Sequence, residues 1–246
     1  MEHDSGALAQ FYQSPLGQVA RRLILRRLRE IWPDLCGARL LGYGFPLPFL
    51  RSFLGETERT IALLPEQLGA LAWPSPTVLS VVGDEAALPF SDALFDRVLV
   101  AHGLESADSL RPLMRQFWRV LAPGGRLLLV VPNRTSLWAQ VERSPFAYGR
   151  PFTRDELQTL LCETLFAPEQ WETALLLPPF RSARLIGSGA SWESLGRKLW
   201  PALAGVHILE ATKSLYAQIP PALARKQQRV LAPVHTGSAS PAYRDF

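Results

Sequence analysis

Two short apolar runs with an amphipathic segment between them constrain the fold more than any other feature of this chain. Residues 96–101 and 127–131 are rich in Val and Leu with little alternation, as in strands covered on both faces of a sheet. Between them, apolar residues recur at the spacing of one helix face: Leu110, Leu113, Met114, Phe117 and Leu121. The sequence Ala-Pro-Gly-Gly at 122–125 is expected to end this helix in a tight turn. Strand, helix and strand in this order predict a βαβ unit with parallel strands.

Further segments extend this pattern in both directions. Glycines follow a predicted strand that begins at Arg39, and other strands are predicted at 60–64, 77–82, 170–177 and 205–216. A helix is predicted over about 11–32, and another starts at Thr153, where Glu156 completes a capping box. We therefore expect one doubly wound α/β domain over 1–217.

The ends of the chain and its composition add weaker constraints. A short helix is predicted at 191–200, and residues 218–246 combine prolines, a basic run and small residues, which predicts a flexible basic tail. The two cysteines, Cys36 and Cys162, lack metal-ligand spacing and are expected to be buried. We expect no metal site.

Charge and hydropathy limit the partners and the location of the protein. The formal net charge of +4 comes from an excess of arginine, which does not by itself indicate nucleic-acid binding. No run approaches the ~18 apolar residues of a membrane span, and the first residues lack a signal pattern, so a cytoplasmic protein is expected. The arginines of the helix at 11–32 leave two alternatives open, a solvated face or a peripheral membrane contact.

The functional site is expected beyond the carboxyl ends of the parallel strands, where open α/β sheets bind ligands. Those positions follow Val82, Val100 and Val131. The dinucleotide fingerprint Gly-x-Gly-x-x-Gly is absent after the first strand because position 47 is Leu, and no Gly-Lys-Ser or Gly-Lys-Thr phosphate loop occurs. The glycines after the first strand do allow close approach of a ligand to the backbone.

Several motifs together resemble class I S-adenosylmethionine-dependent methyltransferases, in particular the type 11 branch with the ubiquinone and menaquinone methyltransferases. They are Gly83-Asp84 with Leu88-Pro-Phe90, Phe95-Asp96 at the next strand, and Arg119-Val-Leu-Ala-Pro-Gly-Gly-Arg126. The resemblance implies a Rossmann-like sheet of seven strands, mostly parallel, with an antiparallel last strand beside strand five. It also implies S-adenosylmethionine as cofactor and a small or medium-sized molecule as methyl acceptor. In the resembled family a helix before the first strand often covers the cofactor, so the helix at 11–32 is expected to act as a lid.

The same resemblance assigns cofactor-binding roles to residues at the strand ends. The glycine loop would lie beside the amino-acid part of the cofactor, and carboxylates after strands two and three would bind the ribose and the adenine. The residues concerned are Gly42, Tyr43, Gly44, Glu66, Asp84 and Glu85. For Glu66 a helix-start carboxylate is an equally open reading, and for Asp84 a turn or helix cap is the structural alternative.

The acceptor is expected to meet Tyr12, His102, Asn133 and Arg134. His102 is a candidate general base because an imidazole titrates near neutral pH, although a structural histidine at a strand end is the alternative. The aromatic and basic residues of the loop after the fifth strand would either bind an acceptor or pack as a lid: Trp138, Phe146, Tyr148 and Arg150.

Two departures from the family pattern keep a second function open. Leu40 stands where the family has an acid, and Pro46 stands where it has the third glycine. The preferred hypothesis is a methyltransferase; the alternative is a methyltransferase fold without turnover that acts as a binding or regulatory partner of another protein. An open cleft joining Gly44, Asp84 and His102 would favour the enzyme.

Overall fold

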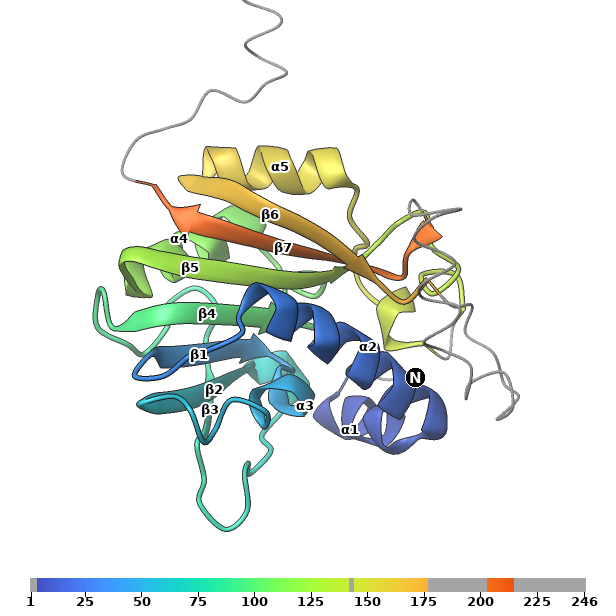
Figure 1. Ribbon diagram of the computed structural model, residues 1–246, viewed down its shortest axis with the longest axis horizontal. Coiled ribbons are helices and arrows are strands. Elements are labelled where there is room, and N and C mark those ends of the chain that lie inside the picture. Colours follow the sequence, from blue (N-terminus) through green and yellow to red (C-terminus); the bar gives the residue numbers. More distant parts are fainter. Residues whose placement is uncertain (1–3, 142–143, 177–202, 215–246) are drawn as a thin grey trace, which may run out of the picture.

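The computed structural model describes residues 4–141, 144–176 and 203–214. Seven strands form one sheet in the order β3-β2-β1-β4-β5-β7-β6 (Figure 1). The strands are β1 (Arg39–Gly44), β2 (Arg59–Pro65), β3 (Ser80–Gly83), β4 (Phe95–Ala101), β5 (Leu121–Pro132), β6 (Phe166–Ala174) and β7 (Val206–Lys213).

The sheet is parallel from β3 to β5, and β7 runs antiparallel between β5 and β6. The predicted doubly wound, Rossmann-like sheet with an antiparallel last strand is therefore confirmed. The predicted helix at 191–200 and the predicted tail at 218–246 lie outside the described residues.

Helices cover both faces of the sheet. On one face lie α1 (Ser5–Gln13), α2 (Pro15–Ile31) and the short α3 (Leu47–Leu50); on the other lie α4 (Leu110–Val120) and α5 (Arg154–Glu163) (Figure 1). Each face has its own apolar core. Alternate residues of β1 divide between these cores, with Leu40 facing α2 and Leu41 facing the α4 side.

The segment predicted as one helix over 11–32 consists of two helices that meet at Ser14. Ser14 ends α1, and its side chain caps α2 by accepting a hydrogen bond from the Gly17 amide. Pro15 occupies the first turn of α2, where its missing N–H costs nothing. The prediction of one continuous helix was wrong, and the break turns α1 towards the end of the sheet where the parallel strands finish (Figure 1).

The predicted turn at 122–125 also takes another form. The strand β5 begins at Leu121, directly after α4, and its register with β4 shifts between Phe95 and Arg97. Gly124 has a φ of 72° at this irregularity. Thr153 and Glu156 form the predicted capping box of α5, which is confirmed.

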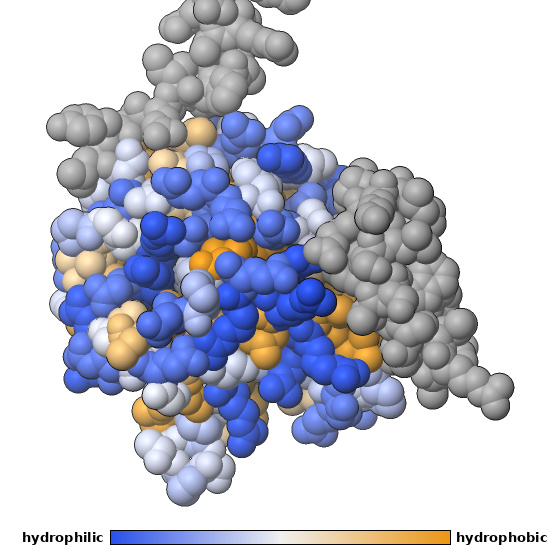
Figure 2. Space-filling view, in the orientation of Figure 1, coloured by the Kyte–Doolittle hydropathy of each residue, from blue (hydrophilic) through white to orange (hydrophobic). Residues whose placement is uncertain are grey.

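Two surface features bear on the sequence predictions. Cys162 is buried, but Cys36 is exposed, so the prediction that both are buried was wrong for Cys36. Arg22 and Arg26 lie on the exposed side of α2, and the face of the molecule seen in Figure 2 is mainly hydrophilic. Within the described ranges, none of the helices is long and apolar enough to cross a membrane.

Candidate functional site

The carboxyl ends of β1 to β4 form an edge with two unlike halves. We call the ends of β2 and β3, with Glu66, Asp84 and Glu85, the carboxylate half. We call the ends of β1 and β4, with Tyr12 of α1 and the buried residues Phe45, His102 and Glu105, the aromatic half. Adjacent strands bring the two halves together, because β1 pairs with β2 on one side and with β4 on the other.

In the aromatic half, β1 turns directly onto the end of β4. Gly44 has a φ of 87°, and the Phe45 amide donates a 2.7 Å hydrogen bond to the Ala101 carbonyl. A Cβ at Gly44 would lie 2.5 Å from the Ala101 oxygen. Gly44 is therefore required by the close approach of the two strands. The side of Gly42 is filled by Pro46 and Leu50, since a Cβ there would lie 2.6 and 2.5 Å from their side chains.

The centre of the aromatic half is a chain of three buried polar side chains. The Tyr12 hydroxyl and His102 Nε2 are 2.7 Å apart and share a hydrogen bond. On the other side of the ring, His102 Nδ1 lies 3.3 Å from Glu105 Oε1. All three residues are at most 7% exposed. Tyr12 and His102, which lie 90 residues apart in the sequence, are thus brought into contact.

Burial and the neighbouring carboxylate keep the Tyr12 hydroxyl neutral. Burial, together with the nearby charge of Glu105, raises the pKa of Tyr12 well above its ordinary value. The carboxylate favours the imidazole tautomer that carries its proton on Nδ1, which leaves Nε2 as an acceptor for the Tyr12 hydroxyl. His102 also has a φ of 51°, a backbone conformation that side chains other than Gly rarely adopt.

Aromatic rings enclose the three residues. Phe45 stacks on Tyr12 with ring centroids 6.4 Å apart, and Phe49 meets the edge of Tyr12 at 5.7 Å. Phe146, from the loop after β5, lies 5.0 Å from the His102 ring. These rings fill the space around His102, which is 2% exposed.

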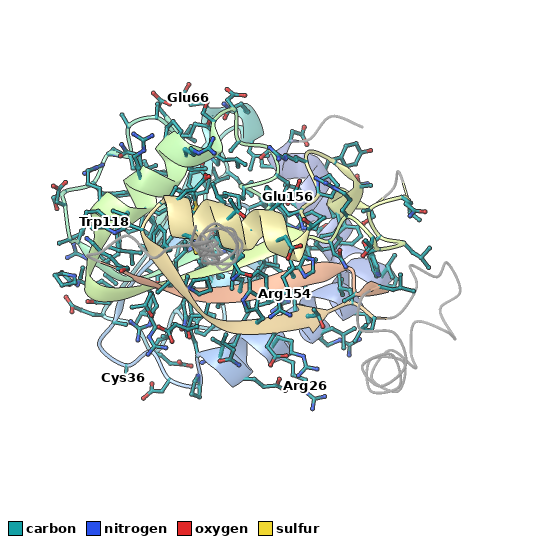
Figure 3. All side chains as sticks on the ribbon, turned by 90° about the horizontal axis from the view of Figure 1, so that it is seen from above. Arg26, Cys36, Glu66, Trp118, Arg154 and Glu156 are labelled. Atoms are coloured by element: carbon teal, nitrogen blue, oxygen red, sulfur yellow. The ribbon has the colours of Figure 1, made fainter. Side chains whose placement is uncertain are left out.

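The carboxylate half is open. Asp84 is exposed, and its Oδ1 accepts a 2.8 Å hydrogen bond from the Ala86 amide. Glu66 begins a short 3₁₀ helix after β2 and projects from the periphery of the molecule (Figure 3). Glu85 instead ties the loop to the start of α4, because its Oε1 accepts a 2.9 Å hydrogen bond from the Asp108 amide. The side chain of Tyr43 packs against Phe117 on the α4 side, and its ring also lies against Gly103 after β4.

The predicted acceptor residues after β5 are engaged in local structure. Asn133 is buried, and its Nδ2 donates to the Ala204 carbonyl at 2.8 Å. The Arg134 guanidinium donates to the Pro151 carbonyl and lies 3.0 Å from the Glu156 carboxylate. The hydrogen bond from the Thr153 backbone and the charge of Arg134 lower the pKa of Glu156. The contact of Asn133 and Arg134 with an acceptor remains a prediction.

Two grooves lie beside this edge, and neither is lined by Gly44, Asp84 or His102. One, of about 740 Å³, separates α4 from α5 and is lined by Leu104, Arg111, Arg150, Phe152 and Glu163 among others. The second, of about 430 Å³, lies beyond the start of α5, which Figure 3 marks with Arg154 and Glu156; it is lined by Asn133, Trp171 and His207 among others. Burial and the charge of Arg154 lower the pKa of His207 to about 4.

Glu105 is the site residue that the sequence did not reveal. Nothing in Ala-His-Gly-Leu-Glu marks its carboxylate as buried, because loop carboxylates are usually solvated. The loop after β5 covers it: the Arg150 amide donates to the Glu105 carbonyl at 2.8 Å, and Gly149 packs on the Glu105 backbone.

The strand order and the open parallel edge define the fold of class I methyltransferases. A solved Thermotoga maritima protein, described as an S-adenosylmethionine-dependent methyltransferase and possible histamine N-methyltransferase, superposes with a TM-score of 0.59 at 18% identity, covering 84% of this chain and 94% of that one. At that identity the likeness shows the fold. Residues 42–129 match the family described as methyltransferase domain, so the resemblance stated from the sequence motifs is confirmed for the segment from β1 into β5.

Curated relatives match within a similarly short stretch. The demethylmenaquinone methyltransferase of Listeria welshimeri is 34% identical over 71 residues, which cover 28% of this chain and 30% of that protein. The ubiquinone/menaquinone biosynthesis C-methyltransferase UbiE of Cereibacter sphaeroides is 36% identical over 63 residues, 24% of this chain and 25% of that protein. The chain therefore spans less than a third of the length of these curated relatives.

The family implies S-adenosylmethionine as the cofactor, and the two halves of the edge fit it unequally. In the carboxylate half, Glu66 and Asp84 offer exposed acceptors beside neighbouring strand ends, where hydroxyl and amino groups of an adenosine could donate. In the aromatic half, Tyr12 and Phe45 cover the end of β1. The residues present thus fit the adenosine part in the carboxylate half, whereas side chains of the protein fill the aromatic half.

Proposed function

We propose that this protein transfers a methyl group from S-adenosylmethionine to a small or medium-sized acceptor at the aromatic half. The observation that carries the proposal is the position of the Tyr12–His102–Glu105 chain at the end of β4, one strand from the glycine turn of a segment that matches methyltransferase domains. A cytoplasmic location and a small-molecule partner belong to the same proposal.

In this proposal the two halves have separate tasks. Asp84 and Glu66 hold the adenosine, with Glu85 fixing the loop between them and α4. The backbone of Gly42, Tyr43 and Gly44 lines the amino-acid part. The cofactor supplies an already activated methyl group, so the protein needs no nucleophile and contributes positioning and a dry site.

The departures from the family pattern shape the expected affinity. Leu40 is fully buried in the core, and Pro46 packs against Gly42, so neither supplies a charged or flexible contact. Binding then depends on the carboxylate half and on backbone groups. Because Tyr12 closes the aromatic half, the apparent affinity also falls by the fraction of molecules in which α1 is open.

Calorimetric titration of the full chain with S-adenosylmethionine and S-adenosylhomocysteine tests the proposal, with Asp84→Ala as the variant. Asp34→Ala is the matched control, because Asp34 is also exposed and its Oδ1 accepts the same 2.8 Å bond from an amide two residues on, between α2 and β1. Binding that weakens at least tenfold in Asp84→Ala and stays unchanged in Asp34→Ala supports the enzyme. No heat from folded protein would favour the alternative, a non-catalytic binding partner.

A further inference from the structure

The Tyr12–His102–Glu105 chain carries information about the acceptor, and the inference drawn from it rests on the proposed methyl transfer. His102 is held between a carboxylate and a phenol in a site walled by Phe45, Phe49 and Phe146. Such a site recognises both a ring and a hydroxyl group.

Among the described residues, Glu105 is buried with few polar neighbours. It is 4% exposed, and within the described residues neither carboxylate oxygen makes a hydrogen bond of ordinary geometry. The nearest basic atom is His102 Nδ1 at 3.3 Å. A buried carboxylate without hydrogen bonds is costly, and such groups persist chiefly where function requires them.

The backbone of His102 gives a second, independent indication. Its φ of 51° places a non-glycine residue in the left-handed region, next to the close approach of Gly103 to Gly44. Strain of this kind clusters at ligand-binding and active sites. It aims the imidazole so that Nε2 faces α1 while Nδ1 faces Glu105.

The group that Nε2 now binds is itself a phenol, carried by a helix that lies outside the sheet. The helix α1 joins α2 at the Ser14–Pro15 corner and contributes no strand partner. We propose that the acceptor is a phenol, that its ring and hydroxyl replace those of Tyr12 against His102, and that Glu105 is the positioning residue for the imidazole.

The chemistry of transfer to a phenol balances at this site. The O–H bond breaks as the new O–CH₃ bond forms, and the electron pair of the broken S–CH₃ bond remains on sulfur. The proton passes to His102 Nε2, and Glu105 stabilises the resulting imidazolium.

The test uses p-cresol, the side chain of tyrosine, and toluene, its analogue without the hydroxyl. Each is titrated by NMR into the full wild-type chain and into Tyr12→Ala, which leaves a space of the matching shape. We expect p-cresol to bind Tyr12→Ala at least tenfold more tightly than wild type, and at least fivefold more tightly than toluene.

Three further variants test whether p-cresol is recognised by His102 and Glu105 or only fills the space that Tyr12 leaves. In Tyr12→Ala/His102→Gln the preference for p-cresol over toluene should fall. In Tyr12→Ala/Glu105→Met it should also fall, and Tyr12→Ala/Glu105→Gln, which keeps an acceptor oxygen, should recover part of it. The ¹⁵N shifts of His102 should report a single Nδ1–H tautomer while Glu105 is present and a mixture of tautomers in the Glu105→Met variant, a change that a packing role would not produce.

Equal binding of toluene and p-cresol, or no binding of either to folded Tyr12→Ala, would overturn the phenol assignment. An unchanged His102 tautomer in the Glu105→Met variant would overturn the role of Glu105. These results are independent of cofactor titration: if S-adenosylmethionine binds but p-cresol shows no preference, only this inference fails, and the reverse result defeats the methyl-transfer proposal while the phenol site stands.

Discussion

The carboxylate half and the aromatic half of the sheet edge are adjacent but differ in exposure and in what holds them. Glu66 and Asp84 are exposed, and Asp84 makes only a local turn bond. Tyr12, His102 and Glu105 are buried, come from two segments far apart in the chain, and are sealed by aromatic rings. One half is open to solvent, whereas the other is closed by the protein's own tyrosine.

The two halves also differ in how far the segment that matches methyltransferase domains contains them. The carboxylate half lies within the segment that matches methyltransferase domains, and its position follows from strand order alone. The aromatic half also needs α1, which precedes that segment. Its chemistry is therefore the better guide to what distinguishes this protein from its relatives.

The largest effect is expected where β1 closes onto β4. Gly44→Ala should lower the free energy of unfolding by about 3 kcal/mol or more, because a positive φ combines with a backbone clash. Gly37→Ala is the matched control: Gly37 also has a positive φ, of 72°, but open space around its Cβ position, and should cost about 1 kcal/mol. Urea unfolding measures both, and equal losses would show that the close approach is not rigid.

The second effect concerns His207, whose buried Nε2 has no hydrogen-bond partner within the described residues, unlike His102. Burial and Arg154 lower the pKa of His207 to about 4, below the ~6.5 of an unfolded chain. As pH falls from 6.5 to 4, the unfolded chain takes up a proton that the folded state resists, so this histidine should lower the unfolding free energy by about 3 kcal/mol. Its contribution should stay level above pH 6.5. His207→Gln should remove this part of the pH dependence of the unfolding free energy. If the unfolding free energy of His207→Gln still fell between pH 6.5 and pH 4 as in the wild type, the attribution of this pH dependence to His207 would be contradicted.

A smaller effect is expected at the hydrogen bond that closes the aromatic half. Tyr12→Phe keeps the ring but leaves His102 Nε2 unsatisfied, which should cost about 1 kcal/mol of unfolding free energy. A double-mutant cycle with His102→Gln measures the coupling of the two residues. A coupling near zero would mean that aromatic packing alone closes this half.

The smallest effect on stability belongs to the carboxylate half. Glu66→Ala and Asp84→Ala should each change the unfolding free energy by less than about 0.5 kcal/mol, because both side chains are exposed. Thermal unfolding without ligand measures this. A large loss in either variant would assign that carboxylate a structural role and weaken its place in the cofactor site.

The sheet could be predicted because the local sequence of its strands already has the pattern of buried strands. The strands at 96–101 and 127–131 are continuous apolar runs, and parallel topology then places His102 beside the glycine turn. Tyr12 and His102 were both predicted to meet the acceptor, but a direct contact between them was not predicted. The break at Ser14 could have been predicted, because a Ser-Pro pair is a helix-start signal. It was missed because the apolar periodicity of a helix is present on both sides of it.

Other parts of the site depend on tertiary packing that local sequence does not encode. Glu105 is buried only because the loop from Phe146 to Arg150 folds over it. Likewise, the hydrogen bond from the Asp108 amide to Glu85 depends on how the start of α4 packs, while the cofactor contact of Glu85 stays a prediction. Neither outcome follows from residue type or spacing.

The central claim is that one ligand spans an open half and a half closed by Tyr12. Calorimetric titration of wild type and Tyr12→Ala with adenosine and with S-adenosylhomocysteine tests it most directly. We expect adenosine to bind both proteins equally, whereas S-adenosylhomocysteine should bind Tyr12→Ala at least tenfold more tightly, because α1 no longer has to open. An equal response of both ligands to the substitution, or no binding of either to folded protein, would contradict it.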